Sequence, residues 1–199
     1  MKHIWVKLAI VVVWSVGVRA QTCREITAAA ELARAKSLAA LRDASRDAGN
    51  DYRLHLIRAF RSFQLQPRSK EAAARLLSMV PGDDAQQKIV LTLGDSLCDS
   101  ESAADMKALA QVNERFAREL ATAVLIVPSL LPRYLAYSTI AVQDPHSDYA
   151  VEMERVCRAF GPMFTRALGE LPEDKIRVFT TQVMKADACQ PIAIPESDQ

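Results

Sequence analysis

Residues 102–124 read SAADMKALAQVNERFARELATAV, and this stretch decides the predicted fold. Apolar side chains recur in it every three or four residues, at Met106, Leu109, Val112, Phe116, Leu120 and Val124. That spacing gathers them on one face of a helix, which is then buried in a core. Ser102, followed three residues later by Asp105, resembles a capping box with Asp in place of Glu. The stretch therefore predicts the longest helix of the protein.

Apolar residues recur with helical spacing through most of the rest of the chain. Turn-forming residues interrupt the pattern at Gly49-Asn50, Pro67, Pro81-Gly82, Pro128, Asp144-Pro145, Gly161-Pro162 and Pro172. No segment alternates apolar and polar residues as a half-buried strand does. The sequence therefore predicts an all-α fold of roughly seven to nine helices, arranged as a bundle or as an irregular α-solenoid.

Local signals mark the ends and faces of several predicted helices. Residues 25–47 form one Ala-rich predicted helix whose apolar face carries Ile26, Ala30, Ala33, Leu41 and Ala44. Asn50 or Asp51 is expected to cap the next helix, and Ser69 a short one. Residues 84–97 are predicted to be helical with an inward stripe of Ala85, Ile89, Leu93 and Leu97.

Composition limits the class of protein. Half of the residues are hydrophobic, 25% are charged, and the formal net charge is +1. This composition supplies a sizeable core, and it excludes a highly charged disordered chain and a polytopic membrane protein. A net charge near zero also argues against nucleic acid as the partner.

Residues 1–20 have the pattern of a secretory signal peptide. Two lysines precede an apolar run, and Val18-Arg19-Ala20 offers small or β-branched residues for cleavage after the last of them. An uncleaved anchor and a lipoprotein acylated at Cys23 are the alternatives. We expect export to the periplasm or cell exterior of a bacterium, with no stable membrane span after cleavage. The exported chain would hold one helical domain over 21–188 and an extended tail over 189–199.

The four cysteines all follow the predicted cleavage site. An even number of cysteines in an exported chain predicts two disulfides. A helical hairpin turning near Leu171 would return Cys189 toward Cys157, which leaves Cys23 to pair with Cys98. Buried free thiols are the alternative. The absence of a C-x-x-C motif argues against a zinc site or a redox motif.

Gly94-Asp95-Ser96-Leu97, after the apolar run Ile89-Val90-Leu91, resembles the nucleophile block of the SGNH (GDSL-type) esterases. The resemblance implies that Ser96 is a nucleophile at a strand-to-helix turn, with a histidine as its base. His146 is the one histidine that follows Ser96, and it stands one residue short of the Asp-x-x-His spacing of that family. The helical spacing predicts instead that Ser96 lies on the solvent face of a helix.

Metal and cofactor sites are not expected. His55 and His146 have no second ligand three or four residues further along a helix. Asp51, four residues before His55, is explained as well by a helix cap. The sequence also lacks a glycine-rich phosphate loop and a haem attachment motif.

Charge is unevenly distributed along the chain, in two adjacent blocks. Residues 51–81 are rich in basic side chains, namely Arg53, Arg58, Arg61, Arg68, Lys70 and Arg75. Residues 83–105 are acidic through Asp83, Asp84, Asp95, Asp99, Glu101 and Asp105. The two blocks could form a bipolar surface for a partner or for self-association, with the six basic residues as the possible partner surface, or they could pair with each other across the fold.

Tyr134, Tyr137 and Tyr149 form the densest aromatic cluster, near Pro128 and Pro132. Such a cluster lines a peptide groove in some proteins and belongs to the core in most. Without a catalytic constellation, the sequence predicts an exported, non-catalytic helical protein with a binding, adaptor or structural role toward a protein or peptide. The alternatives are a secreted esterase using Ser96 and a carrier of a small apolar ligand.

Overall fold

The computed structural model describes residues 26–46, 49, 51–93, 103–141 and 148–182. Within these ranges the chain is helical and contains no strand, which confirms the all-α prediction. The described part holds ten α-helices, more than the predicted number. The signal peptide, the tail, Ser96, His146 and three of the cysteines lie outside these residues, so those predictions stay predictions.

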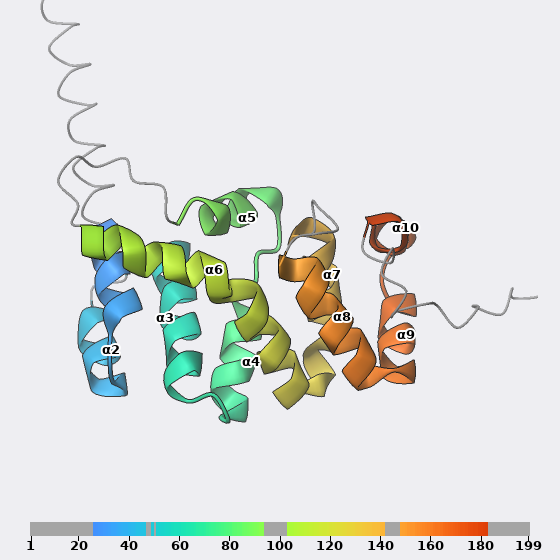
Figure 1. Ribbon diagram of the computed structural model, residues 1–199, viewed down its shortest axis with the longest axis horizontal. Helices are drawn as coiled ribbons and strands as arrows, with labels where there is room; N and C mark the ends of the chain where they lie inside the picture. The colour runs from blue at the N-terminus through green and yellow to red at the C-terminus, as the bar shows by residue number, and fades with distance from the viewer. Residues whose placement is uncertain (1–25, 47–48, 50, 94–102, 142–147, 183–199) are drawn as a thin grey trace, which may run out of the picture.

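The first helix spans residues 26–34. The other elements are α2 (Leu38–Ala44), α3 (Tyr52–Leu65), α4 (Lys70–Ser78), α5 (Asp84–Leu91), α6 (Ala103–Ile126), the 3₁₀ turn η1 (Pro128–Leu130), α7 (Leu131–Ala141), α8 (Asp148–Phe160), α9 (Pro162–Gly169) and α10 (Glu173–Gln182). Figure 1 shows an elongated arrangement in which α2, α3 and α4 stand side by side and α6 crosses them.

Helix α6 is the central element of the fold. It packs on α3 and α4 in one half of the molecule and on α7 and α8 in the other. Its predicted apolar face is buried along most of its length, at Leu109, Val112, Phe116, Leu120 and Val124. Helix α6 therefore contacts both the N-terminal half, which holds α2–α4, and the C-terminal half, which holds α7–α10. In a solenoid each repeat contacts only its neighbours, so this arrangement is closer to a bundle.

Several predicted helix ends are confirmed. The Asp51 carboxylate accepts a hydrogen bond from the backbone N–H of Arg53 (2.8 Å), and the Ser69 hydroxyl accepts one from that of Ala72 (3.2 Å). Gly161 has a positive φ of 49°, which ends α8 and lets α9 begin at Pro162. These ends follow from local side-chain chemistry, so local sequence was sufficient to find them.

The single helix predicted over 25–47 is wrong. It is two helices, because the chain leaves helical geometry between Ala35 and Ser37. The Ser37 hydroxyl accepts a hydrogen bond from the N–H of Ala40 at 3.2 Å and so caps α2. At the break, the Arg61 side chain donates its Nε–H to the carbonyl oxygen of Ala35, 2.7 Å away.

The stripe predicted over 84–97 is also wrong in register. Helix α5 ends at Leu91, Ala85 is exposed, and the residues that α5 buries are Gln87 and Val90. Leu93 is buried as predicted, beyond the end of the helix, and Leu97 lies outside the described residues. Gln87 faces inward because its side-chain oxygen accepts a hydrogen bond from the hydroxyl of Tyr137 at 2.9 Å.

A column of aromatic rings links the two halves through the core. Phe60 of α3 packs on Phe116 of α6 with ring centroids 6.1 Å apart, and Phe116 meets Tyr137 of α7 edge-to-face at 6.3 Å. Tyr137 in turn meets Tyr149 of α8 edge-to-face at 5.7 Å. Edge-to-face packing is a favoured geometry for aromatic pairs, and the column joins α3 to α6, α7 and α8.

None of the described helices combines the length and the hydropathy that crossing a membrane requires.

Candidate basic pocket between α2, α3 and α4

An open pocket of about 190 Å³ lies between three helices of the N-terminal half. Its lining consists of Leu38, Leu41 and Arg42 from α2, Arg58 and Ser62 from α3, Gln66 at the end of α3, and Arg75 from α4. Three arginines therefore line one small pocket, together with a serine, a glutamine and two leucines.

The break before α2 positions one wall of the pocket. Because Ser37 restarts the helix, Leu38, Leu41 and Arg42 lie on one face of α2 at three- and four-residue spacing. Leu41 is 3% exposed and packs in the core, whereas Leu38 is 39% exposed at the pocket. The apolar wall is thus anchored at one residue and open at the other.

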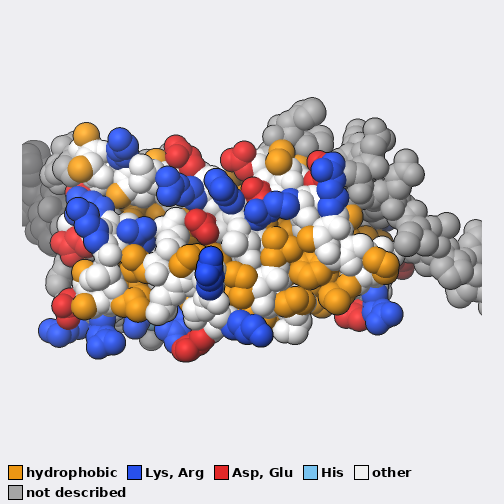
Figure 2. Space-filling model, turned by 60° about the horizontal axis from the view of Figure 1, so that its bottom comes forward, with side chains coloured by type: hydrophobic (Ala, Val, Ile, Leu, Met, Phe, Trp, Pro, Cys, Tyr) orange, Lys and Arg blue, Asp and Glu red, His pale blue; other side chains and the backbone are white. Residues whose placement is uncertain are grey.

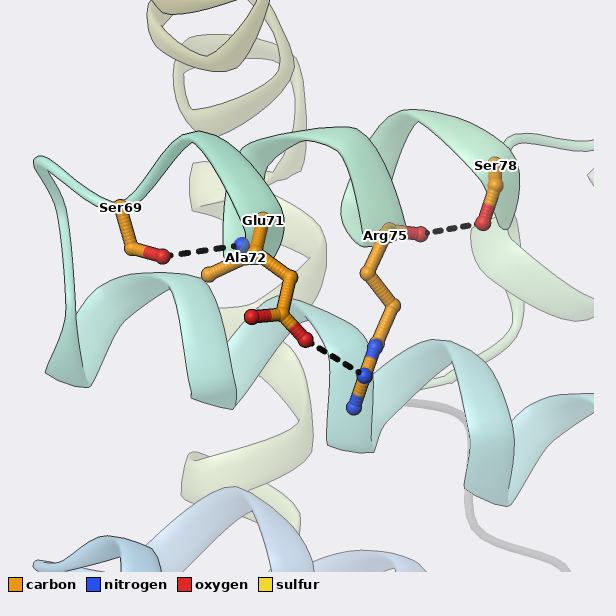
Figure 3. Close-up of polar contacts among 5 residues, drawn as sticks. All are labelled: Ser69, Glu71, Ala72, Arg75 and Ser78. Atoms are coloured by element: carbon orange, nitrogen blue, oxygen red, sulfur yellow. Dashed lines mark hydrogen bonds and ion pairs between the residues drawn. The ribbon is translucent and has the colours of Figure 1, made fainter.

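Arg75 is the one arginine of the pocket that has an ion-pair partner among the described residues. Its guanidinium lies 3.2 Å from the Glu71 carboxylate, one helical turn earlier, and both side chains are largely exposed. Figure 3 shows the two side chains leaving α4 on the same side, toward the neighbouring helix. An exposed pair of this kind holds its partners weakly, since solvent competes for both charges.

Arg42 and Arg58 have no ion-pair partner within the described residues. No carboxylate is among the residues that line the pocket. Guanidinium groups offer planar forks of N–H donors that match the two oxygens of a carboxylate or a phosphate. The arrangement can therefore bind an anion, with the leucines contacting whatever apolar group accompanies it.

The structure places only part of the predicted basic surface in this pocket. Of the six residues, Arg58 and Arg75 line it. Arg61 instead bonds to Ala35 and to the Gln64 side chain (2.8 Å), so it serves the fold. The Nε of Arg53 is buried, and the remaining two are exposed, Arg68 in the turn before α4 and Lys70 at the first residue of α4.

Sequence reasoning missed Arg42, Leu38, Leu41, Ser62 and Gln66 as site residues. Arg42 was hidden because residues 25–47 read as one helix that precedes the basic block. The signal that was available is Ser37, a favourable capping residue within an Ala-rich run. Recognising Ser37 as a cap would have separated α2 from the first helix. The buried face of α2 would then not have been predicted from the spacing in the first helix.

The described ion pairs do not join the basic block to the acidic one. Asp105 pairs with Arg34 of the first helix, and Asp83 caps α5 by accepting a hydrogen bond from the N–H of Gln86. Arg75 pairs within its own helix. Asp95, Asp99 and Glu101 of the acidic block lie outside the described residues, so pairing between the blocks, one of the two predicted arrangements, stays a prediction.

The tyrosine cluster belongs to the core. Tyr134 and Tyr137 are each 1% exposed, and the hydroxyls of Tyr137 and Tyr149 are 2.9 Å apart. Burial away from water raises the pKa of Tyr134, Tyr137 and Tyr149 well above the ordinary tyrosine value, and the same cause acts on Tyr52. These rings fill space between helices, so the peptide groove considered for them is not formed by the described side chains.

The described residues give little support to the predicted esterase site and show no metal site. The run Ile89–Leu91, which an SGNH esterase would use as a strand, lies in helix α5. The His55 Nε2 hydrogen-bonds to the Gly49 carbonyl at 2.8 Å, a structural contact. No group of His, Cys, Asp and Glu side chains capable of holding a metal occurs in the described ranges. Cys157 is half-buried and is not a free thiol.

The surface that faces forward in Figure 2 differs between its two ends. Charged side chains, many of them basic, are spread over the end that holds α2–α4, whereas hydrophobic side chains gather over the other half. At that other end the exposed apolar side chains include Val151 of α8 and Met163 of α9, 62% and 52% exposed. The basic pocket thus sits in the charged part of the molecule.

The chain matches no protein-family model, no curated protein and no solved structure.

Proposed function

We propose that this chain is an exported, non-catalytic binding protein that recognises an acidic protein partner through the face of α2, α3 and α4. One observation carries the proposal: Arg42 and Arg58 line an open pocket and have no acidic partner of their own among the described residues. Such uncompensated charge favours a ligand of opposite sign and excludes a basic one. The signal peptide over 1–20 directs export, and two disulfides brace the helical domain of the exported chain.

A binding role fits how this face is built. The pocket residues sit on helices, which hold side chains more rigidly than loops do. Arg68 and Lys70 extend the positive charge along the turn before α4, which widens the area that an acidic surface meets first. The esterase and the apolar carrier have less support, because α5 replaces the expected strand and this pocket is lined by arginines.

Site-specific photocrosslinking tests the proposal in cells that export the protein. A benzophenone side chain would replace Arg68 on the basic face or, as the matched control, the exposed Glu173 at the start of α10, the opposite end of Figure 1. We expect one protein to crosslink from position 68 and not from 173, through a contact segment rich in Asp and Glu. Equal crosslinking from both positions, a basic contact segment or a nucleic acid adduct would contradict the proposal.

A further inference from the structure

The basic pocket matches one amino-acid residue in size. Pockets that enclose a whole small molecule usually measure roughly 300–1,000 Å³. This one measures about 190 Å³ and is open to solvent. Its volume is therefore below that range, and it suits a group of the size of one amino-acid residue at the end or edge of a larger partner.

Two kinds of wall meet within this small volume. Arg42, Arg58 and Arg75 supply the cationic groups, while Leu38, which is 39% exposed, supplies the open part of the apolar wall and Leu41 is its buried part. A ligand that satisfies both must carry an anion and an apolar group within a few bonds of each other. A bare phosphate leaves the leucines against strongly hydrated oxygens, and an apolar side chain alone leaves the arginines unpaired.

A C-terminal apolar residue of a polypeptide has this combination in one unit. Its α-carboxylate and its side chain leave the same carbon atom, so both fit in a pocket of residue size. An acidic side chain holds its carboxylate away from any apolar neighbour, which would have to enter the pocket separately. Capture of a chain-terminal carboxylate is also a recurring mode of peptide recognition.

We infer that the pocket of Arg42, Arg58, Arg75, Leu38 and Leu41 binds the C-terminal carboxylate of a partner polypeptide whose last residue is apolar. The inference rests on the proposed binding function and adds the chemical group that is recognised. Ser62 and Gln66 supply a hydroxyl and an amide at the same pocket, as donors for the remaining carboxylate lone pairs. Specificity then depends on both the charge and the side chain of one residue.

The probes are small mimics of a chain end. N-acetyl-leucine carries the carboxylate and the apolar side chain, N-acetyl-leucinamide lacks the charge, N-acetyl-serine lacks the apolar group, and inorganic phosphate is a bare anion. Each is titrated into the purified, oxidised protein while amide and arginine Nε resonances are followed by NMR. We expect N-acetyl-leucine to bind at least tenfold more tightly than any of the other three, with shifts at Arg42 and Arg58.

Two double variants separate the pocket from general charge. Arg42→Gln with Arg58→Gln removes two positive charges that line the pocket, and Arg68→Gln with Lys70→Gln removes two outside it. The first pair is expected to weaken N-acetyl-leucine binding at least tenfold, and the second less than twofold. All four positions are wholly or partly exposed, so we expect both variants to keep the fold. An unchanged far-ultraviolet circular dichroism spectrum checks this.

Three results of the titrations would overturn the inference. They are equal binding of the acid and the amide, phosphate binding as tight as that of N-acetyl-leucine, and equal loss of binding in the two double variants. If the Arg68 crosslink persists in the pocket variant, the partner is bound elsewhere on the face. In that case the inference fails while the proposed binding function stands.

Discussion

The aromatic column and the basic pocket share helix α3 and are built on opposite principles. The column buries Phe60, Phe116 and Tyr137 in the core, and the Tyr137 hydroxyl donates a hydrogen bond to Gln87 there. The pocket exposes Leu38 and leaves Arg42 and Arg58 without a described counter-charge. The aromatic column thus contributes mainly to stability, whereas the basic pocket holds charged groups that have no counter-charge among the described residues. Substitutions in the first should change unfolding, and substitutions in the second should change binding.

The largest effect is expected from Phe116→Ala, at the middle of the column. Removing a fully buried ring between Phe60 and Tyr137 leaves a cavity that joins both halves of the core, so we expect a loss of about 3–5 kcal/mol in the free energy of unfolding. Urea denaturation measures it. The pocket substitution Arg58→Gln should change the same quantity by less than about 0.5 kcal/mol. Similar losses in the two variants would erase the contrast between the regions.

Alkaline pH should destabilise the fold through its buried tyrosines, two of which, Tyr137 and Tyr149, belong to the column. Burial raises the pKa of Tyr134, Tyr137 and Tyr149 in the folded state above the ordinary value of 10.0, while unfolded tyrosines ionise near it. The folded state then holds its protons more tightly, so stability is complete below pH 10 and falls as pH rises through it. Each such tyrosine removes up to about 1.4 kcal/mol per pH unit. Urea denaturation from about pH 8 to about pH 11, which brackets the ordinary tyrosine pKa, measures how the free energy of unfolding changes with pH. A free energy of unfolding that stays constant over this range would contradict the raised pKa of the buried tyrosines.

Removing one hydroxyl tests the polar part of the column. Tyr137→Phe leaves the ring in place but deprives the buried Gln87 oxygen of its donor, and Gln87 Nε2 already has no hydrogen-bond partner among the described atoms. We expect a loss of about 1–3 kcal/mol, because a buried amide is left unsatisfied. Tyr52→Phe is the matched control, since that hydroxyl donates to the Met79 carbonyl in a half-buried position and should cost less. Thermal unfolding of both variants compares them.

A smaller effect is expected at the break before α2. Ser37→Ala removes the cap of α2 and should cost about 1 kcal/mol, typical for an N-cap serine. Because α2 carries Arg42 and Leu38, binding of N-acetyl-leucine should also weaken. Ser37→Asp restores a capping side chain and should restore both quantities. Weakened binding that persists in this variant would show that the hydroxyl acts in some way other than capping.

The smallest effect on stability is expected from Glu71→Gln, which removes the neighbour of Arg75. An exposed pair contributes about 0–1 kcal/mol, so unfolding should hardly change. Binding of N-acetyl-leucine should become modestly tighter, because all three arginines then face the ligand without competition. Isothermal titration measures this, and weaker binding would mean that Glu71 positions Arg75 for the ligand.

The sequence predicted what depends on neighbours along the chain. The apolar face of α6, the caps at Asp51 and Ser69 and the end of α8 at Gly161 all follow from spacing or local hydrogen bonding. These features need no knowledge of what packs against them.

The errors arose where a distant residue decides the local structure. The break near Ala35 is supported by Arg61, 26 positions away, and the inward turn of Gln87 depends on Tyr137, 50 positions away. The pocket has the same origin, because its arginines come from three helices and only their packing brings them together. The basic block was therefore recognisable in sequence, whereas the subset that forms a site was not.

The shortness of α2 gives the pocket a dynamic property. A helix of 7 residues is unstable alone, and α2 persists because it packs on α3. Local opening of α2 without global unfolding would remove Leu38, Leu41 and Arg42 together, so the site exists only in the fraction of molecules in which α2 is docked. Part of any binding energy is then used to hold α2 in place. Hydrogen exchange at the α2 amides should accordingly slow when the pocket is occupied, while the aromatic column exchanges as before.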